Sequence, residues 1–154
     1  MSSNGHIPQK EWEIIVENVP IVSVDLVVQD GNSVILGKRT NEPAKGEWWV
    51  PGGRVRKHEQ LMEAVHRIAE KELGIPVTIE RQLGVYQHFY DIADVPDANG
   101  KHYVPVCYLV VPDHTNISPD DQHSEFKWFS QSFEEMNLNP YVETYFDDAG
   151  IHTE

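Results

Sequence analysis

The segment from Leu61 to Gly74 constrains the fold of this chain more than any other. Its apolar residues recur at the i, i+3, i+4 and i+7 spacing of one helix face, and Gly74 with Pro76 just beyond ends the pattern. The sequence therefore predicts a helix with a single apolar face. The residues of that face are Leu61, Ala64, Val65 and Ile68.

One acidic residue falls on this apolar face. Glu72 lies eleven positions after Leu61, and at about 100° per residue the two differ by only about 20° around the helix. A carboxylate that faces the interior has to be protonated, paired with a cation or bound to a metal ion. A salt bridge to a buried Arg at the end of the helix is the structural alternative to a metal. The other acids, Glu59, Glu63 and Glu70, are expected to point to solvent.

The flanking segments alternate between strand and helix patterns. Residues 20–29 and 33–39 are rich in Val and Ile, and Asp30-Gly31-Asn32 between them predicts a hairpin. The pattern as a whole predicts an α+β fold with a mixed β-sheet sandwiched between α-helices. Further strands are expected over 77–90, 102–111 and 124–129, and further helices over 8–18 and from Asn139-Pro140 to Tyr145 or Phe146.

Two local signals qualify this pattern. Pro51-Gly52-Gly53 is expected to turn tightly after the apolar residues Trp48 to Val50. Pro105 cannot donate a backbone hydrogen bond, so it indicates a sheet edge or a bulge within the strand over 102–111.

Length and charge narrow the class of protein. The chain has 154 residues, enough for one domain, and 12 Lys plus Arg against 25 Asp plus Glu give a formal charge of −13. This excess of negative charge excludes a protein whose main activity is to bind the nucleic-acid backbone, which needs a basic surface. The single Cys107 cannot form an internal disulfide, and no stretch has the length of a signal peptide or a membrane span. We therefore expect a cytoplasmic protein with no nucleic-acid or membrane partner.

The loop and helix around residues 52–75 carry a recognisable motif. They resemble the Nudix box, G-x5-E-x7-R-E-U-x-E-E-x-G-U, in which U is aliphatic. Two of its carboxylates are absent, because Ile68 follows the box Arg and Lys71 replaces the first Glu of the final pair. The usual cluster of several Mg²⁺ ions therefore cannot be built. The matching residues are Gly53, Glu59, Arg67, Glu72, Gly74 and Ile75.

The same departures mark one branch of the superfamily, the GDP-mannose mannosyl hydrolases, which this chain resembles over about residues 10–130. The resemblance implies a single Nudix hydrolase domain over 1–154, with the N-terminal segment 1–19 contributing to a dimer or to base binding. The matching segments include PIVSVD (20–25), LGKRTN (36–41), PGGRV (51–55), QHFYD (87–91), HYV (102–104) and DQH (121–123).

The reaction implied by this resemblance is hydrolysis of GDP-mannose, or alternatively GDP-glucose, to GDP and free sugar. Water would attack the anomeric carbon with inversion. Attack at carbon does not approach an anionic phosphorus, so the group that needs stabilising is the leaving diphosphate. One Mg²⁺, with Mn²⁺ as the alternative, and nearby guanidinium groups would supply that stabilisation. The expected partners are a small-molecule nucleotide sugar and, in a homodimer, a second copy of the chain.

The resemblance also implies a role for each matching residue. The metal ligands would be Glu72, the backbone carbonyl of Gly52 and the side-chain oxygen of Gln122. Arg39 and Arg54 would clamp the diphosphate, and His123 would be the general base that takes a proton from water. The remaining substrate-binding positions are Asp25, His88, Tyr103 and Trp12, the last by stacking on guanine.

Several assignments have plain structural alternatives. Lys38 and Arg39 could form a surface charge pair, and Asp25 could be a buried hydrogen-bonded acid or a solvent-facing strand residue. His123 could be an ordinary exposed loop residue, and Trp12 could belong to the core.

Two other functions are compatible with a degenerate box. A Nudix diphosphatase would cut the P–O–P linkage, but Ile68 and Lys71 argue against it. A non-catalytic sensor of nucleotide sugars would also lose box carboxylates. Such a sensor would give no reason for Glu72, Gln122, His123, Arg39 and Arg54 to occur together.

Overall fold

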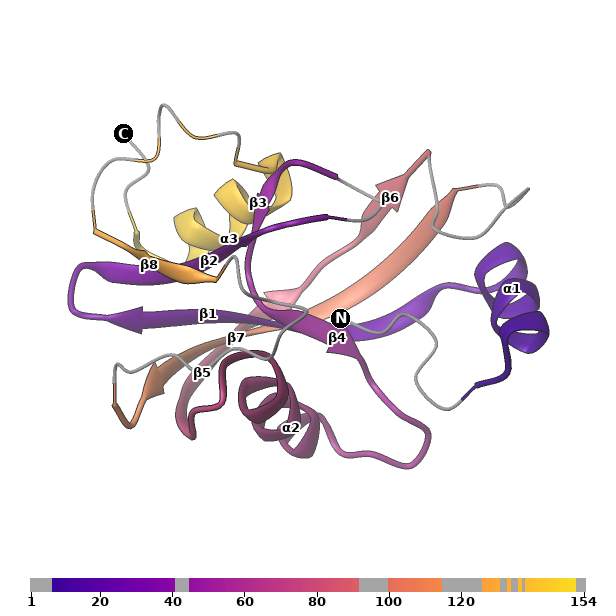
Figure 1. Cartoon of the computed structure of the whole chain (residues 1–154), viewed down its shortest axis with the longest axis horizontal. Helices are drawn as coiled ribbons and strands as arrows, with labels where there is room; N and C mark the ends of the chain where they lie inside the picture. Colours follow the sequence, from indigo (N-terminus) through magenta and orange to yellow (C-terminus); the bar gives the residue numbers. More distant parts are fainter. Residues whose placement is uncertain are drawn as a thin grey trace.

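The computed structural model describes residues 7–40, 45–91, 100–114, 126–130, 133, 136 and 138–151. In these residues an eight-stranded mixed sheet runs through the middle of the molecule, with helices on both sides (Figure 1). This arrangement confirms the predicted α+β fold. The helices are α1 (Gln9–Asn18), α2 (Leu61–Leu73) and α3 (Pro140–Ala149). The strands are β1 (Ile21–Asp30), β2 (Ser33–Lys38), β3 (Trp48–Trp49), β4 (Gly52–Arg54), β5 (Val77–Val85), β6 (His88–Tyr90), β7 (Lys101–Pro112) and β8 (Lys127–Phe129).

Strand β1 is the central element of the sheet. It pairs in parallel with β7 along most of its length, and antiparallel with β2 and β4. Alternate residues of a strand face opposite sides of the sheet. Val24 and Leu26 pack in the apolar cluster that includes α2, whereas Val27 packs in the cluster that includes α3. A polar side chain in the middle of β1 is therefore enclosed by protein.

Helix α2 begins and ends where the sequence predicts. Gln60 and Glu63 form a reciprocal capping box at its start, and Gly74 adopts a left-handed conformation with φ of 68° at its end. Glu72 is 3% exposed, which confirms that its side chain faces the interior. No helix in the part of the chain that the structure describes is long and apolar enough to cross a membrane, and the cytoplasmic location stays a prediction.

The predicted hairpin and terminal helices are also present. Strands β1 and β2 pair antiparallel, with Gln29 opposite Val34. Helix α3 begins after Asn139, whose side chain accepts a hydrogen bond from the N–H of Tyr141 at 2.8 Å. It continues beyond the predicted end at Phe146 to Ala149, and Gly150 with φ of 77° follows it.

The predicted tight turn at Pro51-Gly52-Gly53 is wrong. Gly52 begins β4, which pairs antiparallel with β1 so that Gly52 lies opposite Asp25. Neither glycine has a positive φ. A Cβ on Gly52 would overlap Oδ1 of Asp25 and touch the carbonyl oxygen of Val24. The glycine is therefore required by the close approach of two strands and not by a turn.

Pro105 lies inside the sheet, so the predicted edge position is wrong. Strand β7 has β1 on one side and β5 followed by β6 on the other. Tyr86, which lies between β5 and β6, donates its N–H to the carbonyl of Pro105 at 2.9 Å. The N and O atoms of one strand residue point to the same side, so the missing donor of Pro105 faces the interruption between these two strands.

Candidate functional site

A cleft opens where strands β1, β4, β6 and β7 meet the residue that follows β2. Its empty volume is about 390 Å³ including its open mouth. It brings together four residues that were predicted to bind substrate, and each comes from a different strand or strand end. Two backbone hydrogen bonds fix Arg39 in the lining. Its N–H donates to the carbonyl of Glu47 at 3.0 Å, and its carbonyl accepts a hydrogen bond from the N–H of Gly46 at 2.9 Å. The lining residues are Ser23, Asp25, Arg39, Trp49, Gly53, His88, Tyr90 and Tyr103.

Asp25 is the buried acid of this cleft. It is 6% exposed, and the hydroxyl of Tyr145 in α3 donates to its Oδ2 at 2.5 Å. Burial raises the pKa of Asp25 from 3.8 to about 7, against the opposing effects of the Tyr145 hydrogen bond and the Arg39 charge. The alternative of a buried, hydrogen-bonded acid therefore describes its environment, and the solvent-facing alternative is wrong.

Aromatic rings form one wall of the cleft. His88 is 1% exposed and stacks on Tyr141 of α3, with ring centroids 3.9 Å apart, while Trp49 meets it edge to face at 5.7 Å. Burial lowers the pKa of His88 to about 4, so its imidazole is neutral at pH 7. Its Nε2 is buried and has no hydrogen-bond partner among the described residues.

The sequence did not identify three lining residues, Ser23, Trp49 and Tyr90. Tyr90 lies inside the matching segment QHFYD and Trp49 directly precedes Val50-Pro51, so nearness to the motifs was the available signal. Nothing in the spacing indicates that β3 and β6 bring their rings to the same wall.

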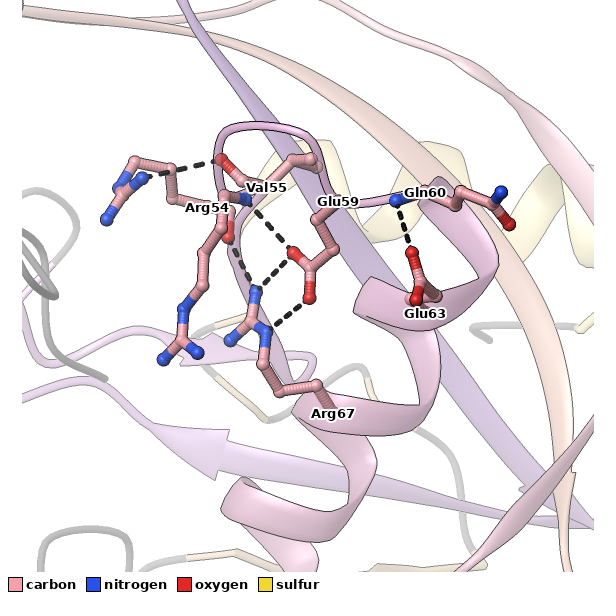
Figure 2. A network of polar contacts seen from close by, with 7 residues as sticks. Arg54, Val55, Glu59, Gln60, Glu63 and Arg67 are labelled. Atoms are coloured by element: carbon pink, nitrogen blue, oxygen red, sulfur yellow. Dashed lines mark hydrogen bonds and ion pairs between the residues drawn. The ribbon is translucent and has the colours of Figure 1, made fainter.

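The residues of the box hold one another in place. Arg67 makes two hydrogen bonds to Glu59, with Nε–Oε2 at 2.7 Å and Nη2–Oε1 at 3.0 Å, and a third to the carbonyl of Arg54 at 2.9 Å (Figure 2). The Arg67 hydrogen bonds lower the pKa of Glu59. The prediction that Glu59 points to solvent is wrong, because its side chain is only 12% exposed and pairs with Arg67. Glu63 is exposed as predicted, and it also caps α2.

Trp12 belongs to α1 and packs in a small apolar cluster against the sheet. It is 1% exposed and packs with Val16 and Ile21, which is a core environment and not that of a base-stacking ring. The guanidinium of Arg54 lies 5.6 Å from the centre of the ring. Arg54 follows the lining residue Gly53 but does not itself line the cleft, and Gln122 and His123 lie outside the described residues.

A family model described as NUDIX domain matches residues 19–145, most of the chain. The chain belongs to the Nudix family. The Nudix enzyme class, that of hydrolases, is likewise supported by related proteins and solved structures.

Two curated proteins illustrate the relationship. The chain is 52% identical over 141 residues to a low-salt glycan biosynthesis protein, Agl8, of Haloferax volcanii, covering 92% of this chain and 89% of that protein. It is 31% identical over 110 residues to an ADP-ribose pyrophosphatase of Methanocaldococcus jannaschii, covering 70% of this chain and 61% of that protein.

Solved Nudix structures share the fold. A MutT NUDIX hydrolase from Burkholderia pseudomallei aligns with a TM-score of 0.68 at 28% identity, covering 84% of this chain and 97% of that one. The NUDIX domain of Shewanella oneidensis NrtR, crystallised with ADP ribose, aligns with a TM-score of 0.67 at 22% identity, covering 86% and 88%.

Nudix hydrolases generally use divalent metal ions such as Mg²⁺. In the described part of this chain no three His, Cys, Asp or Glu side chains gather in a way that would hold one. Ile68 is 2% exposed in the apolar cluster under α2, and Lys71 is exposed, so neither position offers an oxygen ligand. Glu72 is the buried carboxylate of this helix, which fits a site with one protein carboxylate rather than a metal cluster.

Proposed function

We propose that this Nudix hydrolase converts GDP-mannose, or alternatively GDP-glucose, to GDP and free sugar by attack of water at the anomeric carbon with inversion. The observation that carries the proposal is the burial of Ile68, which occupies the box position after Arg67. Ile68 is part of the apolar core between α2 and the sheet, so no carboxylate can be added there without unpacking it. A Nudix box that lacks the carboxylates for a metal cluster is better suited to a reaction at carbon than to one at phosphorus.

The cleft offers groups that suit both halves of a nucleotide sugar. Arg39 at its rim suits a diphosphate, because a planar guanidinium can bind two oxygens at once. A protonated Asp25 and a neutral His88 would hydrogen-bond sugar hydroxyls, and Tyr103 would line the same space. Three comparisons support a nucleotide-sugar substrate. The Haloferax relative is named for glycan biosynthesis, the Methanocaldococcus relative is an ADP-ribose pyrophosphatase, and the Shewanella NUDIX domain was crystallised with ADP ribose.

The metal and the base complete the proposal. Glu72, the carbonyl of Gly52 and the side chain of Gln122 would hold Mg²⁺, or alternatively Mn²⁺, which supplies positive charge to the departing diphosphate. Arg54 would share that charge, and His123 would accept the proton of the attacking water. In the proposed assembly, two copies of the chain form a homodimer, and each copy is a single Nudix domain over 1–154.

A second function is favoured by one comparison. The Methanocaldococcus relative is a pyrophosphatase, and cleavage of the P–O–P linkage by this chain would give a nucleoside monophosphate and a sugar phosphate. The two reactions therefore differ in their products and not only in their rates.

Product analysis separates the two functions. The purified chain is incubated with GDP-mannose and Mg²⁺, and the products are resolved by anion-exchange chromatography and ³¹P NMR. GDP with free mannose supports the proposal, whereas GMP with mannose 1-phosphate supports the diphosphatase. Glu72→Gln should lose both rate and Mg²⁺ activation, and exposed Glu70→Gln on the same helix is the matched control. An unaltered Mg²⁺ dependence in Glu72→Gln would place the metal elsewhere.

A further inference from the structure

Lys101 carries an ammonium group that is buried next to the cleft-lining residue Tyr103. It is the first residue of β7 and is only 4% exposed, although Lys is rarely buried unless its charge is compensated. Its Nζ lies 5.2 Å from the centre of the Trp12 ring and 5.1 Å from the centre of the Tyr103 ring. Both distances are those of cation–π interactions, so the ammonium bridges α1 and the cleft-lining residue of β7.

The same indole ring contacts a second cation. Arg54 of β4 lies 5.6 Å from the centre of Trp12, so that ring is shared by Arg54 and Lys101. The indole Nε1 is buried and has no hydrogen-bond partner among the described residues. The observed contacts of the Trp12 ring are therefore with apolar neighbours and with these two cations.

Geometry links this cluster to the cleft. Lys101 and Tyr103 are two residues apart on β7 and so project from the same face of the strand, and Tyr103 lines the cleft with Asp25 and Arg39. Arg54 adjoins Gly53, another lining residue. A change at Lys101 would reach the cleft along two routes, directly through Tyr103 and through Trp12 to Arg54.

We propose that Lys101 is a positioning residue for the anionic part of the substrate, holding Tyr103 and, through Trp12, Arg54 in the orientation that binds a diphosphate. The inference rests on the proposed function, since it assumes a nucleoside diphosphate group in this cleft. Arg54 contacts the Trp12 ring and also donates through Nη1 to the carbonyl of Val55 at 3.4 Å, so its guanidinium is held by more than one neighbour. The N-terminal helix thereby contributes to binding without touching the substrate.

The test measures binding of GDP in the presence of Mg²⁺ by isothermal titration calorimetry, so it does not depend on turnover. Lys101→Met keeps the length of the side chain but removes the charge, and Lys101→Arg keeps the charge. We expect Lys101→Met to weaken GDP binding by about 10-fold and Lys101→Arg to remain within about 3-fold of the wild type. Lys127→Met is the matched control, because exposed Lys127 makes the same kind of contact with Trp48, at 5.4 Å, and neither residue lines the cleft.

Each outcome has a defined meaning. Wild-type affinity in a folded Lys101→Met, or equal losses in Lys101→Met and Lys101→Arg, would overturn the positioning role. Failure of the wild type itself to bind GDP would overturn the proposed function instead. Should Lys101→Met not fold by circular dichroism, Trp12→Phe replaces it, since a phenyl ring fills part of the same space with a weaker attraction for cations. That variant is expected to bind GDP more weakly, and unchanged affinity would refute the inference.

Discussion

Replacing Asp25 by Asn should change the pH dependence of stability in a defined direction. Asp25 of β1 lies opposite Gly52 of β4 and accepts a hydrogen bond from Tyr145 of α3, and burial raises its pKa to about 7. The folded state therefore holds this proton more tightly than the unfolded state, whose carboxyl has the ordinary pKa of 3.8. The stability that this proton contributes is present at low pH and is lost as the pH rises toward 7. The side-chain amide in Asp25→Asn cannot ionise, so that loss disappears.

The magnitude follows from the size of the shift. Between the two pKa values, each pH unit removes about 1.4 kcal/mol from the free energy of unfolding of the wild type. From pH 5 to pH 8 the loss is about 3 kcal/mol, most of it below pH 7. The Tyr145 hydroxyl can still donate to the amide oxygen in Asp25→Asn, so the fold should persist.

Urea denaturation of both proteins at pH 5, 6, 7 and 8 measures the effect. The quantity of interest is the difference in free energy of unfolding between the wild type and Asp25→Asn, because it cancels the titration of all other groups. We expect this difference to shift by about 3 kcal/mol in favour of the variant from pH 5 to pH 8. Asp30→Asn, on the same strand but exposed, is the control and should follow the wild type. Parallel profiles for wild type and Asp25→Asn would refute the account of a proton held in the cleft.

Three further changes test the site. Gly52→Ala should cost roughly 1–3 kcal/mol of stability, because its Cβ would overlap Asp25. Gly84→Ala is the control and should cost less, because its Cβ would meet Tyr86 at an ordinary 3.4 Å. Equal urea midpoints of the two variants would contradict this. Arg67→Met should cost about 1–2 kcal/mol in thermal or urea unfolding by removing both bonds to Glu59, with a smaller loss at high salt. His123→Ala should lower kcat by roughly 10²–10⁴-fold with its circular dichroism unchanged, and full activity at every pH would remove the base from the proposal.

Elements with strong local signals could be predicted from the sequence. Helix α2 has apolar spacing, a capping pair and Gly74, and each depends only on neighbouring residues. The hairpin of β1 and β2 follows in the same way from Asp30-Gly31-Asn32. The inward position of Glu72 also follows, because helical periodicity fixes the direction of a side chain before any partner is known.

Features that depend on distant pairing could not be predicted. Gly52 and Gly53 are typical of a turn, but their role in the structure is to let β4 lie against β1, some 27 residues earlier in the chain. Pro105 similarly depends on where β5 ends. Glu59 was expected to be solvated because its partner, Arg67, lies eight positions on and reaches it only by folding back from α2 (Figure 2).

The candidate site shows the same division. Asp25, Arg39, His88 and Tyr103 were suggested by family resemblance, and the cleft brings all four together. Trp49, Tyr90 and Lys101 were missed, since ring stacking and burial of an ammonium arise from tertiary contacts that no short motif encodes. Trp12 was assigned to a base on resemblance, while its 1% exposure reflects packing of α1 on the sheet.

The central claim is that water attacks carbon and not phosphorus. Hydrolysis of GDP-mannose in ¹⁸O-labelled water, followed by mass spectrometry of both products, tests it most directly. Cleavage of the bond between the anomeric carbon and oxygen predicts one ¹⁸O in mannose and none in GDP. Label in GDP, or in any phosphorylated product, would contradict the account.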